Sequence, residues 1–298
     1  MTAPASGPVI VGPVIVGVDG GASGRDALHL GRWAADILGV PLVAAVVHPA
    51  PSALGSGRVD AEWVADRHRA AEAVLDGART VLKDATGPVE YRPVASSSAA
   101  HGLHDLAEEL SAQVIVVGSG KGAPRQRLFA GSTAEQLLAG SVIPIAVAPA
   151  GMDSPPGTLG RIGVAYIDTP DGRAALSEAA RLARRTQTPL RLYTVVIDAD
   201  AAKPFLIGDD VERAYADTAR ETFEESLRRA AESIPDLRVD WELLGGNVIE
   251  ALSELDEVDV LFCGSRGYGP ARRVLLGGVS TRLVRGAKCP VVVVPRSG

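Results

Sequence analysis

The chain has 298 residues, a length that predicts two domains. A hydrophobic fraction of 46% with 22% charged residues is typical of a soluble globular protein, and no apolar run reaches the length of a membrane span. The net charge of −6 argues against a general surface for nucleic acid or for an anionic membrane.

The start of the chain resembles an export signal only superficially. It has no basic region before its apolar stretch, and Gly and Pro residues interrupt that stretch. The chain has two cysteines, both in its second half, and these do not make a disulfide framework. We therefore expect a cytoplasmic protein.

Residues 7–17 read GPVIVGPVIVG, a short tandem duplication. Only the second copy leads into Asp19, so we expect the first core strand at 14–18 and a flexible tail over residues 1–12, with an added edge strand as the alternative for the upstream copy.

Short β-branched runs then alternate with amphipathic segments along the chain. The predicted strands are 14–18, 42–47, 89–94, 114–118, 143–148, 162–167, 190–197, 238–244, 258–264 and 290–294. The predicted helices are 24–38, 61–83, 100–111, 132–140, 172–186, 209–233, 247–255 and 279–286. Continuous Val/Ile strands that alternate with helices predict an α/β fold, with a parallel sheet covered on both faces.

The second half of the chain repeats the first. Gly118 and Gly264 are separated by 146 positions, as are Gly131 and Gly277, and each set leads to an apolar last strand. A repeat of this size is a domain rather than a solenoid module. We therefore predict a first domain at 13–149, a Pro- and Gly-rich linker at 150–158 and a second domain at 159–298.

Each half also carries a glycine loop between a strand and a helix. Gly118 and Gly264 end β-branched runs, whereas Gly131-Ser132 and Gly277-Gly278 each open an apolar helix. Ligands of open parallel sheets bind beyond the carboxyl ends of the strands, and helix N-termini favour anions. The loops therefore predict phosphate sites, although glycines that end strands and a serine that caps a helix could be structural only.

These residues resemble the universal stress protein family in its tandem-domain actinobacterial type. The family's ATP-binding signature is G-x2-G-x9-G followed by Ser, Thr or Asn. The second half matches it with Gly264, Gly267 and Gly277, but has Gly278 at the hydroxyl position. The first half matches it with Gly118, Gly131 and Ser132, but has Lys121 at the second glycine.

The resemblance implies two flavodoxin-like or Rossmann-like domains, each a five-stranded parallel sheet with helices on both faces. It also implies that ATP, with or without Mg²⁺, is bound in some members, and that domains pair through their last strands. We accordingly expect the two halves to dock on each other, and a homodimer of the whole chain through the last strands.

The departures from the signature matter for nucleotide binding. If the position of Lys121 needs a positive φ, a non-glycine residue there costs about 1–2 kcal/mol, which a contact of its ammonium group with phosphate could offset. Gly278 lacks a hydroxyl but keeps its backbone N–H, and Ser280 is a candidate replacement hydroxyl.

An aspartate after the first strand distinguishes the two halves. Asp19 corresponds to the family's aspartate, which helps to hold the nucleoside end of the nucleotide. By the repeat register its counterpart is Ile167, with Asp168 one position later, so the second site is weaker at this point. Asp19 could alternatively be a turn or cap residue.

His101 and His104 resemble neither a complete metal site nor a correctly placed nucleotidylyltransferase motif, so we interpret them as the start of a surface helix. The chain has no P-loop and no evident general base or nucleophile near the glycine loops.

We therefore predict a regulatory protein of the stress response, not an enzyme, that binds ATP in at least one half. The alternatives are a scaffold that does not bind nucleotide and a slow ATPase or autophosphorylating enzyme. The expected partners are a nucleotide and a downstream protein that the sequence does not identify.

Overall fold

The computed structural model describes residues 12–50, 57–196, 209–265 and 278–295. Its strands are β1 (Val14–Gly17), β2 (Leu42–Pro49), β3 (Val89–Ser96), β4 (Val114–Gly118), β5 (Ile145–Ala148), β6 (Ile162–Ala165), β7 (Leu190–Val196), β8 (Val239–Gly245), β9 (Val260–Gly264) and β10 (Val291–Val294). Its helices are α1 (Ala22–Leu38), α2 (Gly57–Val81), α3 (Ala99–Glu109), α4 (Ser132–Gly140), α5 (Pro170–Thr186), α6 (Asp209–Glu232), α7 (Val248–Ser253) and α8 (Gly278–Leu283). The alternation confirms the predicted α/β fold.

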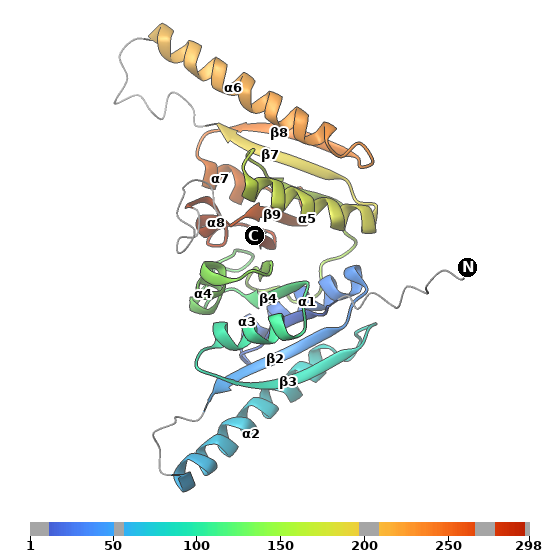
Figure 1. Ribbon diagram of the computed structural model, residues 1–298, viewed down its shortest axis with the longest axis vertical. Helices are drawn as coiled ribbons and strands as arrows, with labels where there is room; N and C mark the ends of the chain where they lie inside the picture. The colour runs from blue at the N-terminus through green and yellow to red at the C-terminus, as the bar shows by residue number, and fades with distance from the viewer. Residues whose placement is uncertain (1–11, 51–56, 197–208, 266–277, 296–298) are drawn as a thin grey trace, which may run out of the picture.

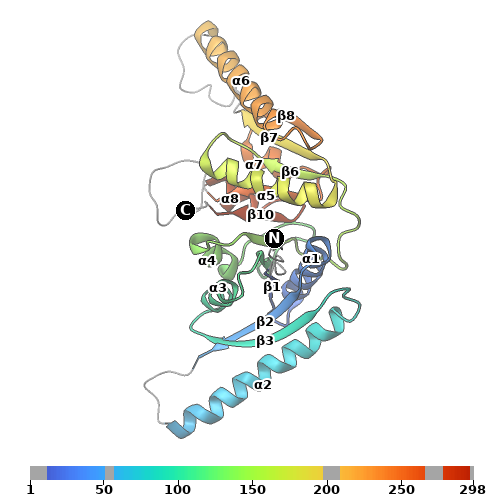
Figure 2. The same ribbon diagram turned by 45° about the vertical axis from the view of Figure 1, so that its right-hand side comes forward.

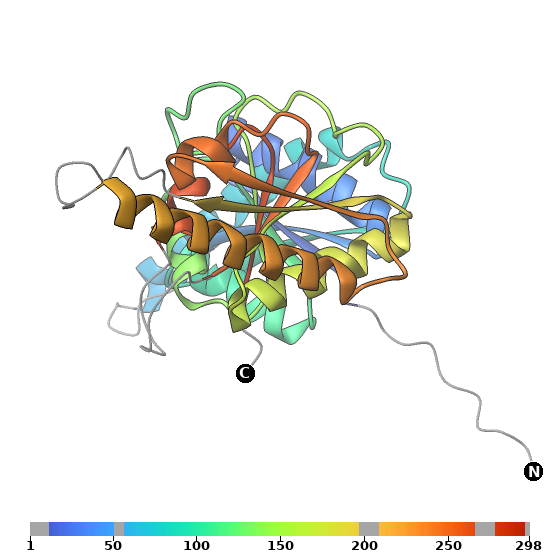
Figure 3. The same cartoon turned by 90° about the horizontal axis from the view of Figure 1, so that it is seen from above.

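All described strands belong to one ten-stranded sheet, in the order β3-β2-β1-β4-β5-β10-β9-β6-β7-β8. The five strands of each half are parallel to one another, whereas β5 and β10 pair antiparallel. The two halves therefore meet at the centre of the molecule, and α2 and α6 lie at its opposite ends (Figures 1 and 2). Seen along the long axis, the strands fan out because the sheet twists (Figure 3).

The buried side chains form one core on each face of this sheet. Alternation along a strand sends Val14 and Val16 to one face and Ile15 to the other. The first core lies under α1, α2, α5 and α6, and the second lies under α3, α4, α7 and α8. Each core contains residues of both halves, so the halves are joined by continuous apolar packing as well as by strand pairing.

The last strands of the two halves pair with each other within the chain, as we expected. In the β5–β10 ladder Val292 lies opposite Ala146, and each strand has a second neighbour in its own half. Both edges of both last strands are therefore occupied. A homodimer through these strands, our other expectation, is wrong for this arrangement, because no edge of β5 or β10 is left for a second copy.

Polar contacts on the α4 side reinforce this junction. The Leu128 N–H donates to the Ala287 carbonyl at 2.9 Å, and the Ala130 N–H donates to that of Val284 at 2.7 Å. Glu254 of the second half pairs with Arg127 of the first half at 2.6 Å and with Lys288 at 2.8 Å. These two cations lower the pKa of Glu254 to about 2.

The Glu254 contacts predict that the stability of the fold depends on pH. A carboxyl group whose pKa is lower in the folded chain stabilises the fold above its ordinary pKa of 4.5, and this contribution is lost as the pH falls toward 2. The difference in urea midpoint between the parent and Glu254→Gln should therefore be largest near pH 6 and should narrow below pH 4.5. Because the pair is exposed, the difference should be small and should shrink further in high salt. A constant difference across this pH range would contradict the assignment.

A buried carboxylate on α1 holds the segment between the halves. Asp26 is only 5% exposed, and its two oxygens accept the N–H groups of Gly151 and Met152 at 3.0 and 2.9 Å. Burial raises the pKa of this carboxyl, although the two backbone N–H groups oppose the shift. Further along the same segment, the Trp33 indole N–H donates to the Gly157 carbonyl at 2.9 Å. The linker is thus attached to α1 at two points.

Both cysteines are buried and unpaired. Cys263 lies in β9 and Cys289 precedes β10, and burial raises the pKa of each thiol to about 12. Thiolate is the reactive form, so the folded chain should not react with iodoacetamide at pH 8, whereas the unfolded chain should gain two adducts by mass spectrometry. Rapid labelling of the folded chain would show that either site opens readily.

Candidate functional site

The candidate site lies where the strand order of the first half reverses. β1 pairs with β2 on one side and with β4 on the other, so the switch point at which parallel sheets hold their ligands lies beyond the carboxyl ends of β1 and β4. Asp19 follows β1 by two residues, and Gly118 is the last residue of β4. The fold therefore brings these two predicted site residues to the same edge of the sheet, from segments about 100 positions apart.

The glycine loop after β4 closes on itself at its base. Ser119 and Ala130 form an antiparallel bridge, and the Gly120 N–H donates to the Phe129 carbonyl. A Cβ atom on Gly131 would lie 3.0 Å from the Cα of Gly120, so the two backbones touch. Our sequence analysis missed Gly120, although its place two residues after Gly118 was a usable signal. This closure holds the start of α4 beside the end of β4.

A buried hydroxyl fixes the closed loop to the sheet. Ser119 is 2% exposed, and its Oγ donates to the Ala148 carbonyl of β5 at 2.8 Å and accepts the Phe129 N–H at 3.2 Å. Sequence analysis assigned no role to Ser119. The base of the loop is therefore anchored, whereas Lys121 beyond it is exposed.

The N-terminus of α4 is suited to an anion. Helix α4 begins at the exposed Ser132, and its N-cap, Gly131, has an extended backbone and makes no side-chain cap. The first turn therefore presents backbone N–H groups at the positive end of the helix dipole. Glu135 also lies in this turn, and Arg285 of the second half forms an ion pair with it.

Lys121 does not adopt a positive φ angle, the backbone conformation that would be unfavourable for a lysine. In this loop the positive φ angles belong to Gly122 (82°) and Gln126 (58°), and Lys121 is not among the residues with positive φ. The conditional penalty of about 1–2 kcal/mol therefore does not apply. Lys121 lies beyond the base of the loop and is exposed.

Asp19 caps the start of α1. Its Oδ1 accepts the N–H groups of Gly21 and Gly24 at 2.9 and 3.1 Å, and the residue is exposed. This is the cap role that we considered as an alternative. The carboxylate also lies beyond the end of β1, near the switch point, and the cap holds it in place there.

The glycines that end β4 and β9 have a packing role. A Cβ atom on Gly118 would lie 2.0 Å from the Ser23 carbonyl oxygen in the first turn of α1. One on Gly264 would lie 2.7 Å from the Asp171 carbonyl group in the first turn of α5. Close approach of helix to strand therefore requires glycine at both positions, whether or not phosphate binds.

The second half differs at the equivalent of Asp19. Thr169 caps α5 and accepts the Gly172 N–H at 3.1 Å, which is the counterpart of the Asp19–Gly24 contact. Asp168 instead pairs with Arg173 and accepts the Tyr166 hydroxyl at 3.4 Å. Asp168 therefore does not take the place of Asp19. This agrees with the shift of one residue between them in the repeat register.

The rest of the second loop is described only in part. Gly267 and Gly277 lie outside the described residues, and Gly278 is the first residue of α8. Ser280 is 2% exposed, and its hydroxyl donates to the Ser265 carbonyl at 3.0 Å. Ser280 thus ties α8 to the end of β9, which argues against its use as a replacement hydroxyl for phosphate.

His101 and His104 lie in the first part of α3, where each pairs with a carboxylate one turn later, Asp105 and Glu108. Within the described residues, no group of three or more potential metal ligands lies together, and no helix is long and apolar enough to span a membrane.

Comparison with known proteins assigns both halves to one family. The model of the universal stress protein family matches residues 11–149 and 158–295. A universal stress protein of Mycobacterium tuberculosis is 31% identical over 294 residues, covering 95% of this chain and 99% of the relative. A universal stress protein structure from Archaeoglobus fulgidus has a TM-score of 0.69 at 20% identity, covering 97% of this chain and 98% of that one. A universal stress protein solved in complex with cAMP is similar to one half, with a TM-score of 0.38 at 23% identity, covering 47% of this chain and 98% of that one. The chain therefore belongs to the universal stress protein family and carries two domains of that family in tandem.

Proposed function

We propose that this protein is a non-enzymatic regulator of the stress response that binds ATP, with or without Mg²⁺, in its first half. The observation that carries the proposal is the closed loop of Gly118–Gly131. It holds the uncapped N-terminus of α4 beside the end of β4, at the same edge of the sheet as Asp19. Backbone N–H groups at a helix N-terminus and a nearby lysine are suited to phosphate, and the fixed carboxylate to the hydroxyls of a ribose.

Each predicted residue has a separate place in this proposal. The N–H groups of Gly131 and Ser132 and the hydroxyl of Ser132 would hold the phosphates, with Gly118 leaving room for the backbone. Lys121 would add an ammonium group, and Asp19 would lie at the nucleoside end. The second half supports the proposal less well, because Asp168 is paired elsewhere and Ser280 is buried.

Native mass spectrometry with increasing Mg-ATP tests the proposal. One adduct per chain is expected at low millimolar nucleotide. A second adduct would indicate that the second loop also binds nucleotide, through Gly264, Gly267, Gly277 and Gly278. The absence of any adduct at millimolar ATP would refute nucleotide binding in both halves.

A scaffold that does not bind nucleotide is the second candidate. It is favoured by the packing roles of Gly118 and Gly264 and by the cap role of Asp19, which account for these residues without a ligand. The same titration separates the two functions.

A further inference from the structure

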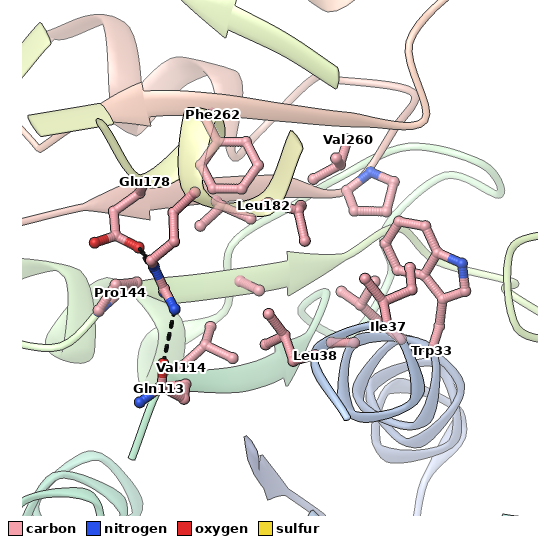
Figure 4. A pocket seen from close by; sticks show the side chains of 16 residues that line it. Trp33, Ile37, Leu38, Gln113, Val114, Pro144, Glu178, Leu182, Val260 and Phe262 are labelled. Carbon is pink, nitrogen blue, oxygen red and sulfur yellow. Dashed lines mark hydrogen bonds and ion pairs between the residues drawn. The ribbon is translucent and has the colours of Figure 1, made fainter. Parts of the chain in front are cut away.

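A cavity lies on the opposite side of the domain junction from α4 and α8. It is enclosed between α1 and α5 and has the four central strands as its floor, with a volume of about 80 Å³. Its apolar walls come from both halves, with Trp33 and Leu38 from one helix and Leu182 from the other, above Val114 and Phe262 (Figure 4). The candidate nucleotide loop contributes nothing to this cavity, since none of its residues lines it.

The two halves differ at the floor of the cavity. Ala146 of β5 lies directly opposite Val292 of β10, and the two residues occupy equivalent positions of the repeat. Both face the same core, and both line the cavity. Where the second half has the branched side chain of valine, the first half has only a methyl group, and the missing volume is left open.

The walls of the cavity differ in polarity in the same way. Leu30 and Trp33 on α1 are the repeat counterparts of Glu178 and Arg181 on α5, at the separation of 148 positions that also relates Gly24 to Gly172, and all four line the cavity. Figure 4 shows Gln113 and Glu178 at one end and Trp33 at the other. The cavity is therefore apolar at the Trp33 end and in its middle, and polar at the opposite end.

The polar end carries an exposed guanidinium group. The Arg181 guanidinium donates to Gln113 Oε1 at 2.9 Å and to Glu178 Oε2 at 2.7 Å, so it bridges the two halves. Arg181 is the arginine that lines the cavity, and its side chain is 52% exposed although it pairs with Glu178. An incoming anion can approach this end from solvent.

We propose that this cavity binds a small amphipathic carboxylate, such as a fatty acid of short or medium chain. The end of its hydrocarbon chain lies between Trp33 and Leu182 over Ala146, and its carboxylate lies at Arg181. An apolar cavity of about 150 Å³ holds a benzene molecule, so this smaller one holds the last few carbons of a chain, and the remainder reaches toward the mouth. Each further methylene that becomes buried should increase the affinity about fourfold.

The fluorescence of Trp33 tests this proposal directly. The chain has three tryptophans, and replacing the two partly exposed ones (Trp63→Phe and Trp241→Phe) leaves Trp33 as the only indole. Titration with hexanoate, octanoate and decanoate should give a saturable change in emission, with affinity rising along the series. Octanol, which lacks the charge, should bind at least tenfold more weakly than octanoate. Arg181→Gln should abolish that preference.

Ala146→Val supplies the decisive variant, because it makes the first half match the second at the floor of the cavity. It should weaken octanoate binding at least tenfold. The control is Ala139→Val, the same substitution at an exposed position of α4, which should leave the affinity unchanged. Thermal unfolding of both variants confirms that they are folded. Ser132→Glu, which targets the nucleotide loop, should bind octanoate with the affinity of the parent. A failure of the nucleotide proposal is therefore distinguishable from a failure of the cavity proposal.

Several outcomes would overturn the proposal. They are the absence of saturable binding up to 1 mM octanoate, equal affinity for octanol and octanoate, and unchanged binding by Ala146→Val. A parent dimer that Ala146→Val converts to a monomer, seen by light scattering, would assign this face to a second copy of the chain and would also overturn it.

Discussion

Ser132→Glu is expected to weaken ATP binding in the first half by roughly 100-fold, or about 2.7 kcal/mol. Ser132 is the first residue of α4 and is exposed, so a carboxylate there would lie where the proposed phosphates accept the N–H groups of the first turn. Two like charges at this distance repel strongly once the site is partly desolvated. The same carboxylate interacts favourably with the helix dipole, so the fold should keep its stability or gain up to about 1 kcal/mol.

Calorimetric titration with Mg-ATP measures the affinity, and native mass spectrometry measures how many nucleotides each chain binds. The number of adducts should fall by one relative to the parent. The control is Gln136→Glu, which adds the same charge at an exposed position one turn further along α4. It should change the affinity by less than about threefold, because the favourable dipole interaction and the proposed phosphate contacts are limited to the first turn. Unchanged affinity in Ser132→Glu would remove the start of α4 from the binding site.

A bulky residue at Gly131 would be a poorer test. The sequence alone does not distinguish Gly131 from Ser132, and from it bulky residues at both positions are expected to abolish binding in the first half while leaving the fold intact. The structure corrects this for Gly131, whose Cβ atom would lie 3.0 Å from the backbone of Gly120. Loss of binding in such a variant could follow from an opened loop alone. Ser132 has no such contact, so its substitution separates binding from folding.

Most of the fold was predictable because its signals are local. Continuous β-branched strands, amphipathic helices and the repeat at a fixed separation together predicted the order of elements, and the resemblance to the family predicted the docking of the last strands. The predicted start of α5, residue 172, is two residues late, although Thr169 is a good N-cap and proline favours the first helical position. The start of α1 at Ala22 was not readable, because its N-cap is Gly21 and the side chain that serves it, Asp19, lies further back.

The candidate site was predictable in position but not in detail. Strand ends and glycines identified the edge of the sheet, whereas the contacts that explain them join segments far apart in the sequence. Ser119 bonds to Ala148, and Gly118 packs against Ser23, and neither contact leaves a trace in the local pattern. The cavity between α1 and α5 depends likewise on the pairing of Ala146 with Val292, which only the β5–β10 register reveals.

Gly118→Ala is expected to destabilise the chain by about 3 kcal/mol, with or without nucleotide. Its Cβ atom would lie 2.0 Å from a backbone oxygen of α1, so the helix or the strand must move, and overpacking that displaces backbone lies at the upper end of the usual range. Urea unfolding of the nucleotide-free chain measures the loss. Gly77→Ala in α2 is the matched control, because its Cβ atom would meet nothing within 4 Å. Alanine favours a helix interior over glycine, so this control should be neutral or more stable by up to about 1 kcal/mol.

The same variant separates the two reasons for a glycine at the end of β4. If Gly118→Ala is destabilised as expected and its folded fraction still binds ATP, then packing against Ser23 accounts for the residue. If Gly118→Ala keeps the stability of the parent, the packing argument is wrong, and a loss of ATP binding in that stable chain would assign the glycine to the phosphates. Gly264→Ala should cost less than Gly118→Ala, because its contact with Asp171 is 2.7 Å rather than 2.0 Å. An equal cost at both positions would mean that the distance of closest approach does not control the penalty.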